Sequence, residues 1–125
     1  MPRIEVEGYG AFEVPAGTRL VNALEANRVD ILHRCGGFAR CTTCRVAFSA
    51  GEPAQMTQAE YNKLDLQDLL GEARLACQIL VEGDMALRPL LTLRDSGLPD
   101  PGPAPQETIA PEPQWLDPAT LKATT

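Results

Sequence analysis

Apolar and polar residues alternate in two short stretches near the start of the chain. Residues 4–7 read Ile-Glu-Val-Glu and residues 11–14 read Ala-Phe-Glu-Val, with turn residues at positions 8–10 between them. A period of two is typical of a strand that buries one face, so this pattern predicts a β-hairpin. After a break, Thr18 is placed to cap a helix through its hydroxyl. The apolar positions of that helix recur at helical spacing, at Leu20, Val21, Ala23 and Leu24.

A second helix is predicted by the capping sequence Thr-Gln-Ala-Glu at residues 57–60. In such a capping box the hydroxyl of Thr57 accepts the amide of Glu60, while the Glu60 carboxylate reaches back to the helix start. We expect this helix to run into residues 64–70 and to stop near Gly71.

Three further apolar stretches predict strands. They lie at residues 45–48, 79–81 and 85–91, and Pro89 is expected to restrict the last to a sheet edge or a strand start. Strands, helix, strand, helix and strands in this order predict an α+β roll in which a mixed sheet packs on one main helix.

The composition changes at residue 95. Seven of the 11 prolines lie in residues 95–125, which favours extended backbone over helix or central strand. We therefore divide the chain into a folded domain at 1–94 and a Pro-rich acidic tail at 95–125. The tail is either flexible or docked, and its Trp115, the only tryptophan of the chain, is the residue best suited to dock on a surface.

Four cysteines carry the candidate chemistry. Cys35, Cys41 and Cys44 follow a C-x5-C-x2-C spacing, and Cys77 lies far along the chain. A cluster of two irons and two sulfides needs four protein thiolates, and plant-type ferredoxins supply them as C-x4-C-x2-C with a distant fourth cysteine. The pattern here is one residue longer in its first gap.

Other uses of four cysteines remain open on these residues alone. Structural zinc is typically held by two C-x2-C pairs, and only Cys41 and Cys44 make one. A disulfide framework needs an oxidising compartment, and a thioredoxin-like pair needs its C-x-x-C motif at the start of a helix. His33 is the one histidine, whereas a Rieske centre uses two. The iron–sulfur interpretation is therefore favoured.

The chain resembles the 2Fe–2S ferredoxins of the β-grasp family over residues 3 to about 94. The resemblance is carried by the four cysteines, Gly36 and Gly37 in the loop, Thr42 and Thr43 inside the C-x2-C, and the run from Arg74 to Gln78. The five-residue first gap resembles the adrenodoxin and putidaredoxin branch more than the plant branch. The resemblance implies a β-grasp fold and a 2Fe–2S cluster.

It also implies the ligands. Cys35, Cys41, Cys44 and Cys77 are the cofactor-binding and metal-binding residues that the family implies, with Cys35 and Cys41 on the outer iron and the other two on the inner one. No catalytic residue is expected. Arg34, Arg40 and Arg45 lie close to these cysteines. Their charges, together with N–H donors to sulfur, predict a reduction potential above the approximately −400 mV of plant-type ferredoxins.

Charge and composition exclude several classes of function. The formal net charge of −6 argues against a nucleic-acid footprint. No stretch approaches the ~18 apolar residues of a membrane span, and no signal peptide is visible, so we expect a cytoplasmic protein. Cysteines in a reducing compartment indicate metal or redox chemistry.

We expect a one-electron carrier that docks transiently with a ferredoxin reductase and an electron-acceptor protein, rather than an enzyme in its own right. In the adrenodoxin branch that the chain resembles, an acidic helix after the cysteine loop docks the reductase. The matching segment here carries Glu60, Asp65, Asp68 and Glu72 against Lys63. The alternative is a redox-sensing or partner-binding module whose cluster state is read out through the C-terminal tail.

Overall fold

The computed structural model describes residues 2–32, 43–93, 109 and 114–116. The segment that carries Cys35 and Cys41, and most of the Pro-rich stretch, lie outside these residues. The predicted division of the chain at residue 95 therefore remains a prediction.

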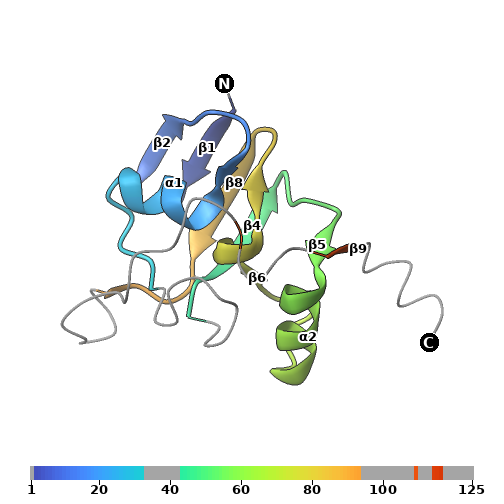
Figure 1. The fold of residues 1–125 in the computed structure, drawn as a ribbon. Helices are drawn as coiled ribbons and strands as arrows, with labels where there is room; N and C mark the ends of the chain where they lie inside the picture. Colours follow the sequence, from blue (N-terminus) through green and yellow to red (C-terminus); the bar gives the residue numbers. More distant parts are fainter. Residues whose placement is uncertain (1, 33–42, 94–108, 110–113, 117–125) are drawn as a thin grey trace.

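One mixed sheet forms the centre of the domain (Figure 1). Its strand order is β2-β1-β8-β4-β6, and only β1 and β8 run parallel. The strands are β1 (Arg3–Val6), β2 (Gly10–Glu13), β4 (Arg45–Ala50), β6 (Arg74–Leu75) and β8 (Met85–Pro89). The predicted hairpin is confirmed, since Ile4 pairs with Phe12 and Val6 with Gly10. The α+β class with a mixed sheet is confirmed as well.

Helix α1 (Leu20–Ala26) lies across one face of this sheet (Figure 1). Leu20, Val21 and Leu24 have no exposed surface, and they pack with Ile4 and Val46 in the core. The predicted cap of this helix was wrong. The N-cap residue is Arg19, and no side chain caps the helix.

Thr18 belongs to a strand instead. It pairs with Val81 in an antiparallel ladder, and its hydroxyl donates to the Pro15 carbonyl oxygen at 2.7 Å in place of capping the helix. The two strands of this pairing are β3 (Thr18–Arg19) and β7 (Leu80–Val81), which is shorter than the strand expected at 79–81.

Helix α2 (Gln58–Leu66) begins where the capping sequence predicted. The Thr57 hydroxyl accepts the Glu60 amide at 3.1 Å. Among the described contacts, the Glu60 carboxylate does not reach back to the start of the helix as a capping box requires. The carboxylate is buried and instead accepts hydrogen bonds from Arg74 and the Leu75 amide. The helix ends before the expected region around Gly71.

Two short strands pair with each other at the start of α2. Strand β5 (Met56–Thr57) pairs antiparallel with β9 (Trp115–Leu116), which comes from the far end of the chain. Figure 1 shows β9 beside β5, directly at the start of α2. The Pro-rich stretch thus contributes a strand to the fold at these two residues.

The expectation for Pro89 was wrong. Strand β8 is central, between β1 and β4, and Pro89 is its last residue, opposite Val46. A proline at the end of a central strand is tolerated because the ladder continues through its neighbour: the Leu90 amide donates to the Arg45 carbonyl oxygen at 2.9 Å. Among the described residues, no helix is long and apolar enough to cross a membrane.

Candidate metal centre

A short strand pairing brings Cys44 and Cys77 together. Strands β4 and β6 pair through Arg45 with Leu75 and Val46 with Arg74. Cys44 directly precedes β4. Cys77 lies in the 3-10 helix η1 (Ala76–Gln78) that follows β6. The Ala76 amide donates to the Cys44 carbonyl oxygen at 2.9 Å, which extends the pairing to the two cysteines.

Both sulfur atoms are buried and accept N–H donors. Cys44 is 2% exposed and Cys77 is fully buried, and they are not joined to each other in a disulfide. The Cys77 amide lies 3.4 Å from Cys44 Sγ, and the Gln78 side-chain nitrogen lies 3.7 Å from Cys77 Sγ. Donors directed at sulfur stabilise thiolates, the form in which cysteine binds a metal. This donor set fits an anionic iron–sulfur group.

A buried arginine supports the same conclusion. Arg19 is 1% exposed, and its Nε donates to the Cys77 carbonyl oxygen at 2.7 Å. The adjoining Leu20 amide donates to the Ile79 carbonyl oxygen at 2.8 Å. The residues at the junction of β3 and α1 therefore hold η1 and the residue after it through these two bonds. A guanidinium at this position lowers the electrostatic cost of gathering negative charge at the cysteines.

An ion pair fixes β6, the strand that leads to Cys77. Glu60 Oε2 accepts Arg74 Nε at 2.8 Å and the Leu75 amide at 2.8 Å, and Glu60 has no exposed surface. Burial raises the pKa of the Glu60 carboxyl, although the hydrogen bond and charge of Arg74 oppose this rise. Burial lowers the pKa of Arg74, but its hydrogen bond and charge interaction with Glu60 outweigh burial, so the net pKa is raised.

The same arginine also holds the loop before β5. Its terminal nitrogens donate to the carbonyl oxygens of Pro53 at 2.8 Å and Gln55 at 3.0 Å, and one lies 3.4 Å from Glu52 Oε2. Arg74 therefore links strand β6, helix α2 and the loop that precedes β5.

The other predicted site residues are only partly described. Cys35, Cys41, His33, Arg34 and Arg40 lie outside the described residues, so the predicted four-cysteine set stays a prediction. Within the described ranges, no three metal-binding side chains gather. Arg45 is half-buried at the start of β4, one residue from Cys44.

Three of the residues that shape this site carry no sequence signal for their role. Arg19, Glu60 and Gln78 are polar and buried, yet each contacts a group that is distant in the sequence or belongs to a remote strand. Arg19 lies 58 positions from Cys77. Glu60 is part of a capping sequence, but that sequence predicts a contact with the nearby helix start. It gives no indication of the observed ion pair with Arg74.

Comparison with known proteins agrees with this geometry. The family described as the 2Fe-2S iron-sulfur cluster binding domain matches residues 4–82. Curated relatives include a subunit of the Na(+)-translocating NADH-quinone reductase from Klebsiella pneumoniae, 33% identical over 84 residues. That match covers 67% of this chain and 20% of the relative. The corresponding protein from Pseudomonas aeruginosa PAO1 is 32% identical over 85 residues, 68% of this chain and 21% of the relative. The chain thus spans about a fifth of the length of these relatives.

Solved structures show the same fold. The ISC-like 2Fe-2S ferredoxin FdxB from Pseudomonas putida JCM 20004 matches with a TM-score of 0.59 and 27% identity, over 70% of this chain and 91% of that one. A ferredoxin from Rhodopseudomonas palustris HaA2 matches with a TM-score of 0.52 and 26% identity, over 73% and 99% of the two chains. The β-grasp ferredoxin fold and the 2Fe–2S cofactor predicted from the sequence are confirmed. The chain belongs to the family of 2Fe-2S iron-sulfur cluster binding domains.

Proposed function

We propose that the protein is a one-electron carrier whose 2Fe–2S cluster is held by Cys35, Cys41, Cys44 and Cys77. The observation that carries the proposal is the convergence of Cys44 and Cys77, buried and within reach of N–H donors, at the junction of β4 and β6. When bound, such a cluster accepts and releases a single electron at a potential set by its surroundings. The carrier is not an enzyme in its own right, because its chemistry is completed by the proteins it meets.

The protein supplies the ligands and their surroundings. Cys44 and Cys77 bind the inner iron in this proposal, since both lie in the core, and Cys35 and Cys41 bind the outer one. The Cys77 amide and Gln78 side chain donate toward sulfur, and Arg19 adds a positive charge behind η1. These groups stabilise the additional negative charge of the reduced state. The five-residue gap between Cys35 and Cys41 supports assignment to the adrenodoxin and putidaredoxin branch.

Electrons enter and leave by transient docking with a ferredoxin reductase and an acceptor protein. The relatives belong to a reductase that is named for NADH and quinone, which supports a position within a sequence of redox partners. A cytoplasmic location suits four cysteines that must stay reduced to bind iron. The folded domain is assigned to residues 1–94 and the Pro-rich tail to 95–125, and the tail docks on the domain where β9 pairs with β5.

The end of α2 and the segment that follows it, residues 65–72, form the proposed docking surface for the reductase. Asp65, Asp68 and Glu72 are exposed there, and Leu66 is 74% exposed among them. An exposed apolar side chain with exposed acids nearby in the sequence suits the small, electrostatically steered interfaces of redox encounters. Glu60, which the sequence placed in the same acidic set, is buried against Arg74 and does not belong to this surface.

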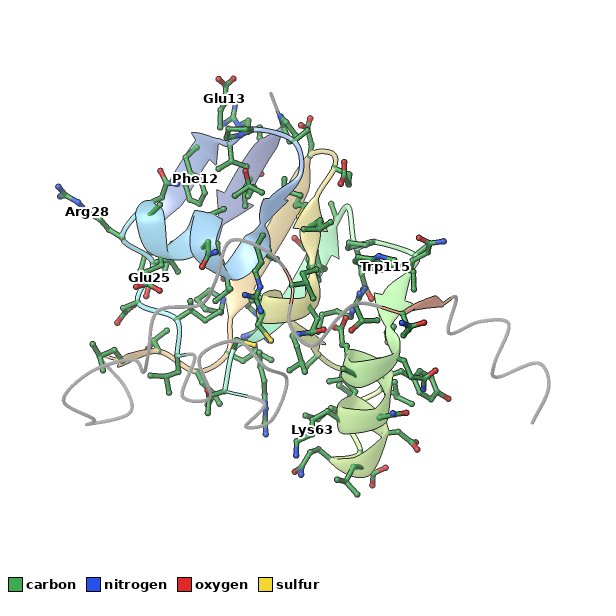
Figure 2. All side chains as sticks on the ribbon, in the orientation of Figure 1. Phe12, Glu13, Glu25, Arg28, Lys63 and Trp115 are labelled. Carbon is green, nitrogen blue, oxygen red and sulfur yellow. The ribbon has the colours of Figure 1, made fainter. Side chains whose placement is uncertain are left out.

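A charge-neutralising variant tests this surface. Asp68 has a φ of +61°, so asparagine is the suitable replacement there, because it tolerates left-handed backbone. We expect Asp65→Asn with Asp68→Asn to slow reduction by an NADPH-linked ferredoxin reductase several-fold at low salt, with a weaker salt dependence. Glu13→Gln is the matched control, since Glu13 is exposed at the end of the molecule remote from α2 (Figure 2). Equal rates for the double variant and the control would contradict the docking assignment.

Electron stoichiometry tests the carrier function itself. Anaerobically reduced protein should reduce about one equivalent of cytochrome c per chain, as a single 2Fe–2S centre requires. Cys44→Ser and Cys77→Ser should abolish this transfer, whereas Thr43→Ser, which keeps the hydroxyl and changes no thiol, should retain it. Transfer that survives in both cysteine variants would refute the assigned ligands.

A further inference from the structure

Strand β9 pairs with β5, next to the start of α2. The Gln58 amide donates to the Gln114 carbonyl oxygen at 2.8 Å, which extends the pairing of β5 with β9 by one residue. Trp115 lies opposite Thr57 in this pairing and lines a surface hollow together with Gln55 and Ile79. Figure 2 shows Trp115 beside β5. Trp115 and Ile79, the residue that follows Gln78, therefore border the same hollow.

Thr57 is the buried residue beneath this strand. It is 1% exposed, and its hydroxyl has two defined partners. The oxygen accepts the Glu60 amide at 3.1 Å, and the hydroxyl hydrogen is directed to Gln78 Oε1 at 2.7 Å. Since an amide N–H can only donate, the Glu60 contact leaves the hydroxyl hydrogen to donate toward Gln78.

This contact fixes the orientation of the Gln78 amide. Gln78 has no exposed surface, and the Thr57 hydroxyl requires an acceptor, so the oxygen of the Gln78 amide faces Thr57. The amide nitrogen then faces Cys77 Sγ at 3.7 Å. A flipped amide would leave the Thr57 hydroxyl hydrogen without the Gln78 acceptor and would place an oxygen against the sulfur.

We propose that strand β9 is a working part of the redox site, which it tunes by holding Thr57 and, through Thr57, the Gln78 amide against the sulfur of Cys77. The inference rests on the proposed function, because it takes Cys77 as a ligand of the cluster. Gln78 and Thr57 are positioning residues for electron transfer. Hydrogen bonds to the sulfur atoms of a cluster favour the reduced form and raise its potential.

The size of the effect follows from one hydrogen bond. Loss of a single such bond changes an equilibrium by about threefold to tenfold. A tenfold change in a one-electron equilibrium corresponds to about 59 mV. We therefore expect the reduction equilibrium to shift toward the oxidised form by this factor when the Gln78 donor is removed or released.

The first arm of the test alters the hydrogen-bond chain in the full-length, cluster-loaded protein. Gln78→Met keeps the length of the side chain and removes the donor, and Thr57→Val keeps the shape and removes the hydroxyl. Spectroelectrochemical titration should give a lower midpoint potential for both, shifted by about a threefold to tenfold factor in the reduction equilibrium. Thr57→Ser keeps the hydroxyl and should match the wild type.

The second arm alters β9 alone. Alternate residue pairs of an antiparallel ladder are hydrogen-bonded, so the bond at Gln58 and Gln114 places the next bonded pair at Met56 and Leu116. Leu116→Pro removes that amide, and Leu116→Ala keeps it. We expect Leu116→Pro to shift Trp115 emission to longer wavelength, to raise its quenching by acrylamide, and to lower the midpoint potential as Thr57→Val does. Leu116→Ala should match the wild type in both measurements.

The outcomes separate this inference from the proposed function. Wild-type protein that binds no cluster would refute the proposed function, and the inference with it. A normal wild-type cluster whose potential is unchanged in Gln78→Met and Thr57→Val would overturn only the tuning. If the emission and quenching of Trp115 change in Leu116→Pro while the midpoint potential does not, the role of β9 is overturned. Loss of the cluster from Leu116→Pro but not from Leu116→Ala would support β9 as part of the site.

Discussion

Arg74→Met removes the cation of a buried ion pair and should destabilise the domain strongly. Glu60 would lose two hydrogen bonds, from Nε at 2.8 Å and from a terminal nitrogen at 3.2 Å, and would keep the Leu75 amide at 2.8 Å. The carbonyl oxygens of Pro53 and Gln55 would lose their guanidinium donors as well. Methionine fills much of the same space, so the loss is electrostatic rather than one of volume.

The magnitude follows from burial. Removing one partner of a buried ion pair costs about 3–5 kcal/mol, because an uncompensated charge remains in the interior. The total stability of a domain is about 5–15 kcal/mol, so this is a large fraction of it. If only a third of the loss lowers the barrier to unfolding, the protein should unfold about tenfold faster, since ~1.4 kcal/mol corresponds to a factor of ten.

The assay is the rate at which visible absorption is lost from cluster-loaded protein in a fixed concentration of urea. Cluster release is irreversible under these conditions, so the rate is the proper measure of stability. Arg3→Met is the matched control. Arg3 also pairs with a carboxylate, Glu5 at 3.7 Å, but both side chains are 61% exposed. Exposed pairs contribute about 0–1 kcal/mol, so this variant should lose its cluster at nearly the wild-type rate.

Equal rates for Arg74→Met and Arg3→Met would contradict this explanation, because burial is the main difference between the two pairs. A double variant, Glu60→Gln with Arg74→Met, gives an independent check. It removes the orphaned charge and should therefore lose its cluster more slowly than Arg74→Met alone. A double variant that is faster than the single one would show that the negative charge of Glu60 is not the source of the instability.

Two more predictions use the same assay. Gly51→Ala should be clearly more destabilising than Gly71→Ala. Both glycines have positive φ, +73° and +84°. A Cβ on Gly51 would lie 2.1 Å from the Asp84 carbonyl oxygen, whereas a Cβ on Gly71 would meet no atom within 4 Å. Equal effects would contradict the close approach of the two backbones. The second concerns pH and Glu60, whose folded-state pKa is raised by burial above its ordinary value of 4.5. As pH rises above that value, the unfolded chain loses the Glu60 proton before the folded chain does, so the contribution of Glu60 to the free energy of unfolding falls. The stability advantage of wild type over Glu60→Gln should therefore be smaller at about pH 7 than at about pH 5. An advantage that grows with pH would mean that Arg74 outweighs burial.

Local patterns were sufficient to predict the hairpin, the start of α2 and the fold class. In the hairpin the alternation of apolar residues matches the observed register, since Ile4 and Val6 are buried and Glu5 is exposed. Thr57 predicted the start of α2 because a cap is a contact within four residues. Such signals depend only on residues that are close together in the sequence.

Long-range contacts explain what the sequence could not predict. Thr18 has the chemistry of a helix cap, yet pairing with Val81 places it in a strand. Glu60 has the chemistry of a capping box, yet Arg74 offers its carboxylate a positive charge in the interior, which the neutral backbone amide of Thr57 does not. In each case the competing partner lies on another element, and a single sequence gives no means of knowing that the two elements meet.

The candidate site shows the same division. The cysteine spacing predicted the cofactor, because thiolates at that spacing are what a binuclear cluster requires. The sequence predicted N–H donors to sulfur and nearby arginines, but it did not predict the roles of Arg19 and Gln78. Arg19 and Gln78 act through a backbone carbonyl and a side-chain amide, and neither residue type signals that role in a sequence.

The proposed binding of one 2Fe–2S centre by four cysteines of this chain, with exchange of a single electron, can be tested on the purified protein. The most direct measurement counts iron, acid-labile sulfide and EPR spins in anaerobically purified protein before and after reduction by dithionite. We predict about two irons and two sulfides per chain, no EPR signal in the oxidised protein, and one spin per chain after reduction. Cys77→Ser should lack the iron, the labile sulfide and the spin. Wild-type protein that carries zinc in place of iron and labile sulfide, or that gives no signal on reduction after anaerobic reconstitution, would contradict it.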